Sequence, residues 1–257
     1  RTGERPMRKM DAKAGTRHYK HLLLTDPRIF PIFPQMKLSM KDLEMNVRFY
    51  VALLMLLVSA SSYSSTAKDD EPPLFYWDAR PRLGFSNFGD DLSSSIVEKI
   101  LGRPVLKVTG ITPGKKKFLA VGSIINYAEE GDIIWGSGVN GKCMDPSDYR
   151  FKTLDVRAVR GPLSRQFLLT LGVPCPEIYG DPTLLLPILF PEFEKREKEV
   201  YDYIVIPHFS DEKLFANTPN MVSVKEEWQT VVKKILTSKF VISSALSGII
   251  VAEAFGI

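Results

Sequence analysis

Short apolar runs alternate with amphipathic stretches from about residue 74 onward. Four runs, at 105–109, 118–124, 132–135 and 156–159, have the length and the β-branched content of buried strands. Two stretches, at 91–101 and 162–171, have a helical period, and Gly172 stands where a glycine would end the second helix. Strands that alternate with helices are typical of βαβ units around a parallel sheet. The pattern therefore predicts an α/β fold.

A second group of such elements follows the charged segment 192–199. Strands are expected at 203–207 and 240–243, with an apolar run at 221–224 and helices at 226–237 and 245–257. We therefore predict two Rossmann-like lobes with parallel sheets, 74–196 and 200–257, in a GT-B-like arrangement. Only two or three βα units fit into the second lobe, so we expect it to be truncated. The first residue is Arg1, which also suggests a fragment of something longer.

The first 70 residues have a different character. Residues 1–44 mix basic residues and prolines without a helix or strand period, and we expect a disordered leader. Residues 45–67 resemble a signal peptide, because basic residues precede the apolar block 49–58 and small residues follow it. The block is shorter than the roughly 20 residues of a spanning helix. A buried amphipathic helix is the alternative interpretation.

These terminal features also set the expected location. A working signal would send the protein into the secretory pathway, to the Golgi or the extracellular space, and without one the protein would be cytoplasmic. Membrane contact is expected only through the apolar segment 49–58.

Charge and cysteine content narrow the function classes. The chain has 34 basic and 30 acidic side chains and a net charge of +4, so we expect no nucleic-acid partner. Cys143 and Cys175 lack the spacing of metal ligands or of a disulfide framework, so we predict no metal site. The basic run 115–117 follows Thr112-Pro113-Gly114 and is expected to be a solvated turn.

Six short motifs follow one another along the chain. They are NFGDDL (87–92), WGSGV (135–139), VRGPLS (159–164), YGDP (179–182), IPH (206–208) and ISSALSG (242–248). In their order and spacing they resemble the polysaccharide pyruvyl transferase family, which includes exopolysaccharide ketal-pyruvate transferases. The resemblance runs from about residue 87 to residue 257. Each motif alone is weak, and the ordered set is specific.

The resemblance implies transfer of the pyruvyl group of phosphoenolpyruvate onto a hexose of a glycan as a ketal, in exopolysaccharide biosynthesis. Phosphoenolpyruvate would be the donor substrate and the glycan the acceptor, with no cofactor. Two alternatives stay open. One is a catalytically inactive relative that binds a sugar or an anion, and the other is a nucleotide-sugar glycosyltransferase, which has a similar two-lobed build.

The donor site is predicted from residues that suit an anion. Arg160 ends a strand just before a helix, and a guanidinium matches phosphate or carboxylate oxygens bidentately. A surface ion pair is the alternative for this side chain. Gly136, Ser137 and Gly138 follow another strand, where backbone N–H groups form anion nests, although a plain tight turn is nearly as plausible. Ser247 belongs to the last motif and is assigned to the same site.

The substrate-binding and catalytic residues come from the other motifs. Asn87, Gly89 and Asp90 precede a helix, whose free N–H groups suit an anion or a sugar hydroxyl. Asp90 as a mere helix cap is the alternative. Asp181 precedes Pro182 and either binds a sugar hydroxyl or forms a turn. His208 follows a strand and is the predicted catalytic group, because an imidazole exchanges protons near neutral pH.

The last motif departs from the family. Members usually have a histidine directly before its glycine, often with serine or arginine two residues earlier, whereas this chain has Ala245 and Ser247. A serine carries no positive charge and is no proton relay near neutral pH. We therefore expect little transfer by this chain.

Overall fold

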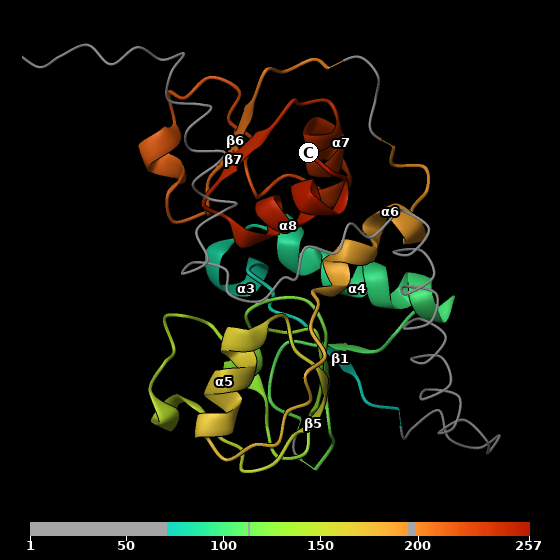
Figure 1. Ribbon diagram of the computed structural model, residues 1–257, viewed down its shortest axis with the longest axis vertical. Coiled ribbons are helices and arrows are strands. Elements are labelled where there is room, and N and C mark those ends of the chain that lie inside the picture. The colour runs from blue at the N-terminus through green and yellow to red at the C-terminus, as the bar shows by residue number, and fades with distance from the viewer. Residues whose placement is uncertain (1–70, 113, 195–198) are drawn as a thin grey trace, which may run out of the picture. The chain divides into compact units, whose positions relative to one another are not determined.

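The computed structural model describes residues 71–257 with the exception of 113 and 195–198, and all of these belong to one compact unit (Figure 1). The predicted leader 1–44 and the signal-like segment 45–67 lie outside the described residues, as does part of the charged segment 192–199. Within the described part, no helix combines the length and the apolar character needed to cross a membrane.

A five-stranded parallel sheet forms the first half of the unit. Its strands lie in the order β2-β1-β3-β4-β5, and every neighbouring pair is parallel. The bounds are β1 Leu74–Phe75, β2 Lys107–Val108, β3 Phe118–Leu119, β4 Ile133–Trp135 and β5 Asp155–Ala158. The predicted α/β class with a parallel sheet is thus confirmed. The sequence missed β1, the strand between β2 and β3, because its two residues follow Pro72-Pro73 without a clear alternation.

Hydrophobic side chains of this sheet form two separate clusters, because successive residues of a strand point to opposite faces. Leu74 packs with Val97 of helix α4 (Phe88–Leu101) and Ala120. Phe75 packs on the other face, in a cluster that includes Leu168 of helix α5 (Pro162–Thr170). The sheet is therefore covered on both faces, as parallel sheets require.

Both helices lie close to their predicted positions. Helix α5 begins at Pro162, and Gly172 directly beyond its cap has φ 78°, as a C-terminal glycine should. Helix α4 begins three residues before the predicted start. Asn87 is its N-cap, since the side-chain oxygen accepts a hydrogen bond from the Gly89 N–H at 3.1 Å.

A second, two-stranded parallel sheet consists of β6 (Ile204–Ile206) and β7 (Val241–Ser243), and the predicted run 221–224 adds only a bridge from Met221 to Val205. Helices α7 (Trp228–Leu236) and α8 (Leu246–Ala254) follow the two strand segments, and α7 contacts α4. The Phe88 N–H donates to the Val224 carbonyl at 2.9 Å. The start of α4 is thus tied to the second sheet.

Several short helices complete the described part. These are α3 (Arg80–Leu83), α6 (Leu186–Leu189) and the 3-10 turns η1 (Ile125–Tyr127), η2 (Pro146–Asp148), η3 (Pro182–Leu185) and η4 (Glu212–Phe215). The two cysteines, Cys143 and Cys175, are not disulfide-bonded.

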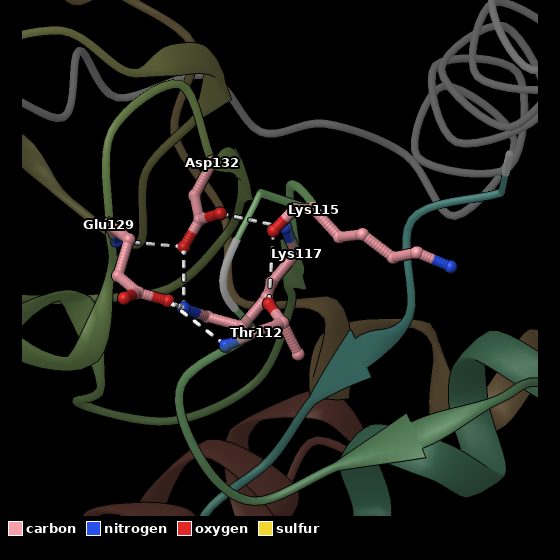
Figure 2. Close-up of polar contacts among 5 residues, drawn as sticks. All are labelled: Thr112, Lys115, Lys117, Glu129 and Asp132. Atoms are coloured by element: carbon pink, nitrogen blue, oxygen red, sulfur yellow. Dashed lines mark hydrogen bonds and ion pairs between the residues drawn. The ribbon is translucent and has the colours of Figure 1, made fainter.

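Lys117 overturns the expectation that the whole basic run is solvated. Lys115 and Lys116 are exposed, but Lys117, directly before β3, is fully buried. Figure 2 shows its polar contacts. Its ammonium group pairs with Glu129 and lies 3.2 Å from Asp132, whose other oxygen accepts the Lys117 N–H at 2.7 Å. Burial raises the pKa of Glu129, but the hydrogen bond from Lys117 outweighs this effect and holds that pKa below its usual range. A buried charge persists only when it is paired in this way.

We expect the change Lys117→Met to destabilise the fold by about 3–5 kcal/mol, because it leaves two carboxylates together without their cation. Chemical denaturation measures the loss. Lys115→Met is the matched control, since this exposed neighbour makes no ion pair among the described residues and should change stability by less than about 0.5 kcal/mol. Equal stabilities for the two variants would contradict the role given to the buried ammonium group.

Candidate functional site

A cavity of about 330 Å³ opens where the loops after several strands meet. Residues that follow β1, β3, β5, β6 and β7 contribute to its wall, so both sheets present their carboxyl ends to it. Ligands of open α/β folds bind at such ends. The predicted site residues that line it are Asn87, Gly89, Asp90, Arg160, Asp181, His208 and Ser247.

The strand order explains why a cavity forms here. The chain moves from β1 to β2 on one side and then crosses to β3 on the other side of β1. The loops after β1 and β3 therefore diverge, which leaves a crevice between them. Trp77 from the loop after β1 and Ser123 from the loop after β3 both line the cavity.

Arg160 lies in this cavity, and it makes no ion pair with any residue that the structure describes. Its guanidinium donates to the Ser123 hydroxyl at 2.7 Å, and its main-chain N–H donates to the Ser137 carbonyl. Burial lowers the pKa of Arg160, which the charge of Asp181 partly offsets. The surface ion pair considered as an alternative is absent, so a half-buried cation faces the cavity.

The loop Gly136-Ser137-Gly138 supports Arg160 by its shape. A side chain at Gly138 would lie only 2.2 Å from the guanidinium, and one at Gly136 would collide with Pro182. The N–H groups of Gly136 and Gly138 donate to the Ala158 and Gly122 carbonyls.

Ser137 is fully buried, with its hydroxyl on the Ala120 carbonyl, and none of the three residues of this loop lines the cavity. The anion nest expected here is therefore replaced by a tight turn that gives Arg160 room, and donor binding by these residues stays a prediction.

Two helix starts meet at Gly89 and Ser247. A side chain at Gly89 would lie 2.3 Å from the Ser247 hydroxyl oxygen, so only glycine lets α8 approach α4 here. Gly248 acts similarly, because a side chain there would collide with Ser243. Ser243 in turn accepts the Ala245 N–H and donates to the Ile206 carbonyl. The last motif thus fixes the position at which helix α8 begins in the cavity wall.

Asp90 faces the cavity from the first turn of α4. Because Asn87 caps this helix, the alternative in which Asp90 is the cap is wrong. Its carboxylate makes no side-chain hydrogen bond with the described residues, and burial, together with the charges of Asp91 and Asp78, raises its pKa to about 7. A side chain at Gly122 would lie 3.5 Å from this carboxylate. Asp90 and the Arg160–Ser123 pair therefore flank the same turn after β3.

His208 lies two residues after the end of β6, and its ring nitrogen Nδ1 is 2.7 Å from the Ser210 hydroxyl. That hydroxyl donates to Asp211 at 2.9 Å, and the Ser210 main-chain N–H points at the same Nδ1 at 3.3 Å. These contacts are compatible with a proton on either ring nitrogen. Burial, aided by the charge of Lys142 and opposed by that of Asp211, lowers the pKa of His208. This shift favours the neutral imidazole, which is able to accept a proton.

Asp181 is a turn residue as well as a cavity residue. Its carboxylate accepts the Thr183 N–H at 2.9 Å and caps η3. Burial raises its pKa, and the hydrogen bonds from Thr183 and the charge of Arg160 act against this. The turn-forming interpretation is therefore satisfied, and sugar binding by Asp181 stays a prediction.

Sequence reasoning missed several residues of the site, and among them are Trp77, Ser123, Lys142 and Phe209, which line the cavity as well. Two signals were available, because Leu74-Phe75-Tyr76-Trp77 is an apolar run of strong strand formers, and Phe209 directly follows the IPH motif. Ser123 and Lys142 lie in loops without a pattern of their own.

Comparison with known proteins places the chain among glycan-related sequences. The model of one family, described as polysaccharide pyruvyl transferase, matches residues 87–257. The chain is 29% identical over 197 residues to the succinoglycan biosynthesis protein ExoV of Rhizobium meliloti (strain 1021). This alignment covers 70% of the present chain and 56% of ExoV. The chain is also 29% identical over 187 residues to the uncharacterized protein L143 of Acanthamoeba polyphaga mimivirus, with 66% and 62% covered. The chain thus spans about six tenths of the length of these relatives. No solved structure matches it significantly.

Proposed function

The chain belongs to the polysaccharide pyruvyl transferase family, and from this premise we propose that it moves the pyruvyl group of phosphoenolpyruvate onto two hydroxyls of a hexose in a glycan. The observation that carries the proposal is the unpaired guanidinium of Arg160 in the same cavity as Asp90 and His208. A cation that forms no ion pair among the described residues suits an anionic donor, and two titratable groups suit a reaction that moves protons.

The donor binds through its negative charges in this proposal. Phosphoenolpyruvate carries a carboxylate and a phosphate, and the fork of Arg160 hydrogen-bonds two oxygens of one of these groups. Lys142 lines the same wall and adds a second positive charge. Because burial weakens solvent screening, Arg160 contributes more here than an exposed arginine would.

Asp90 and His208 divide the proton transfers. Their environments move the two pKa values in opposite directions, which assigns an acid and a base. Protonated Asp90 gives its proton to the methylene carbon of phosphoenolpyruvate, while the first sugar hydroxyl adds to C2 and loses its proton to His208. Phosphate then leaves with the proton from His208. The second hydroxyl closes the ketal on C2 and returns its proton to Asp90, so both groups are restored.

Product analysis tests the reaction. The chain is incubated with phosphoenolpyruvate and methyl hexopyranosides, and phosphate release is measured together with the mass of the glycoside. We expect one ketal for each phosphate released. Consumption of a nucleotide sugar in place of phosphoenolpyruvate would favour the glycosyltransferase alternative and refute the proposal.

Ser247 tests the inactive-relative alternative. Its side chain lies against Gly89, one residue from Asp90, so an imidazole at this position would reach the corner where the proton is moved. We expect Ser247→His to raise transfer by at least roughly 10²-fold, the lower end of the contribution of a positioned acid or base. Phosphate release measures it. Ser147→His is the control, because Ser147 is exposed in η2 and does not line the cavity. Ordinary enzymatic rates in the unchanged chain would contradict the need for this histidine.

A further inference from the structure

A pile of aromatic rings forms one wall of the cavity. The rings of Trp77 and Phe209 are stacked at 6.0 Å between centroids with an interplanar angle of 17°, and the ring of His208 lies 4.1 Å from that of Phe209. Phe85 backs Phe209 at 5.7 Å and is covered in turn by the ammonium group of Lys225. The pile joins the loop after β1 to the loop after β6.

These rings are only partly buried, although Trp77 also packs against the core cluster that contains Phe75. Trp77, Phe85 and Phe209 are all half-buried, and Trp77 and Phe209 contribute to the cavity wall. A large aromatic surface left open beside polar groups is a feature of ligand sites, where apolar contacts give affinity and a few polar groups orient the ligand. Trp77, Phe85 and Phe209 belong neither to the proton-transfer pair nor to the anion corner around Arg160.

We propose that the face of Trp77 binds the pyranose ring of the acceptor, which deepens and rests on the proposed pyruvyl transfer. A pyranose has C–H groups on its face and hydroxyls at its rim, so the face suits an indole and the rim suits polar neighbours. His208 lines the same cavity as Trp77, so a sugar held on Trp77 lies in the same cavity as the proposed base. The family match begins at residue 87, so Trp77 lies outside it.

Saturation-transfer NMR on methyl β-D-galactopyranoside and methyl β-D-glucopyranoside tests the subsite, because the signal is read on the glycoside and survives loss of the tryptophan. We expect Trp77→Leu to weaken binding of at least one glycoside about tenfold, since an indole face contributes on the order of 1.4 kcal/mol. Trp77→Phe should stay within about threefold of the unchanged chain. The affinity for phosphoenolpyruvate, measured by calorimetry, should not change in either variant.

Unchanged glycoside binding in a folded Trp77→Leu variant would overturn the subsite and reduce the pile to packing between two loops. Where Trp77→Leu unfolds the protein, Phe209→Leu gives the second measurement, and the same tenfold loss is expected from it. A chain that binds the glycoside through Trp77 but releases no phosphate from phosphoenolpyruvate, even with the change Ser247→His, would refute the proposed function and leave the sugar subsite standing. The two failures are therefore distinguishable.

Discussion

Changing Arg160 to Met should lower pyruvyl transfer by about 10²- to 10³-fold, the usual effect of removing one group that stabilises developing charge in a buried site. In the proposed reaction, the leaving phosphate gains charge, and Arg160 would stabilise that charge. Since the methionine keeps the stem volume but not the guanidinium, the loss falls on charge stabilisation and donor binding. Steady-state kinetics with varied phosphoenolpyruvate measures both kcat and KM.

Two further variants, Arg160→Lys and Arg157→Met, test whether the loss comes from the guanidinium of Arg160 in the cavity. Arg160→Lys keeps the charge and loses the planar fork, so we expect a smaller drop, concentrated in the KM for phosphoenolpyruvate. Arg157→Met is the matched control, because Arg157 is exposed on β5 and already pairs with Asp155. Similar losses for Arg157 and Arg160 would mean that charge on this side of the protein, and not the guanidinium in the cavity, supports the reaction.

Removal of Arg160 should not destabilise the fold. The side chain is half-buried without an ion pair among the described residues, so its burial costs free energy that the Ser123 hydroxyl only partly returns. We expect Arg160→Met to lose transfer while its melting temperature stays unchanged or rises. This combination is typical of a functional residue that lowers the stability of the fold.

Periodicity was sufficient to predict most elements of the fold. The predicted strands at 132–135, 156–159, 203–207 and 240–243 overlap β4, β5, β6 and β7, because buried parallel strands are short continuous apolar runs. Periodicity failed where contacts with residues elsewhere in the chain decide whether a side chain is buried. Lys117 is buried because Glu129 and Asp132 come together from the next loop, and no local pattern carries that information.

The sequence likewise predicted one part of the candidate site and missed another. Residues that follow strands, such as Arg160 and His208, were predictable, because the carboxyl ends of parallel strands gather at one edge. The part played by each residue was harder to predict. The distinction between Asn87 as the helix cap and Asp90 as an unpartnered acid depends on the register of α4, which begins three residues earlier than its apolar period indicates. Trp77 and Phe209 meet only in three dimensions.

The change Asp90→Asn should lower transfer by roughly 10²- to 10⁴-fold, because an amide of the same size has no acidic proton to give. The pKa of Asp90 is raised to about 7, so the acid form is the active one. Transfer by the unchanged chain should therefore fall as the pH rises above about 7. Asp91→Asn is the matched control, since the charge of Asp91 helps to raise the pKa of Asp90. In this variant the alkaline limb of the pH–rate profile should move to lower pH while catalysis persists.

Stability should respond to Asp90→Asn in the opposite direction from activity. The folded chain keeps a proton on Asp90 that the unfolded chain releases near pH 4, so Asp90 costs stability progressively as the pH rises from about 4 to 7. Asparagine carries no charge to bury. The variant should match the unchanged chain at pH 4 and exceed its free energy of unfolding by about 2–4 kcal/mol above pH 7. Denaturation at both pH values measures this difference. A variant that is less stable at pH 8 would identify Asp90 as a structural residue, and transfer that rises through pH 7 would make it a base, so either result contradicts an acid held ready in the cavity.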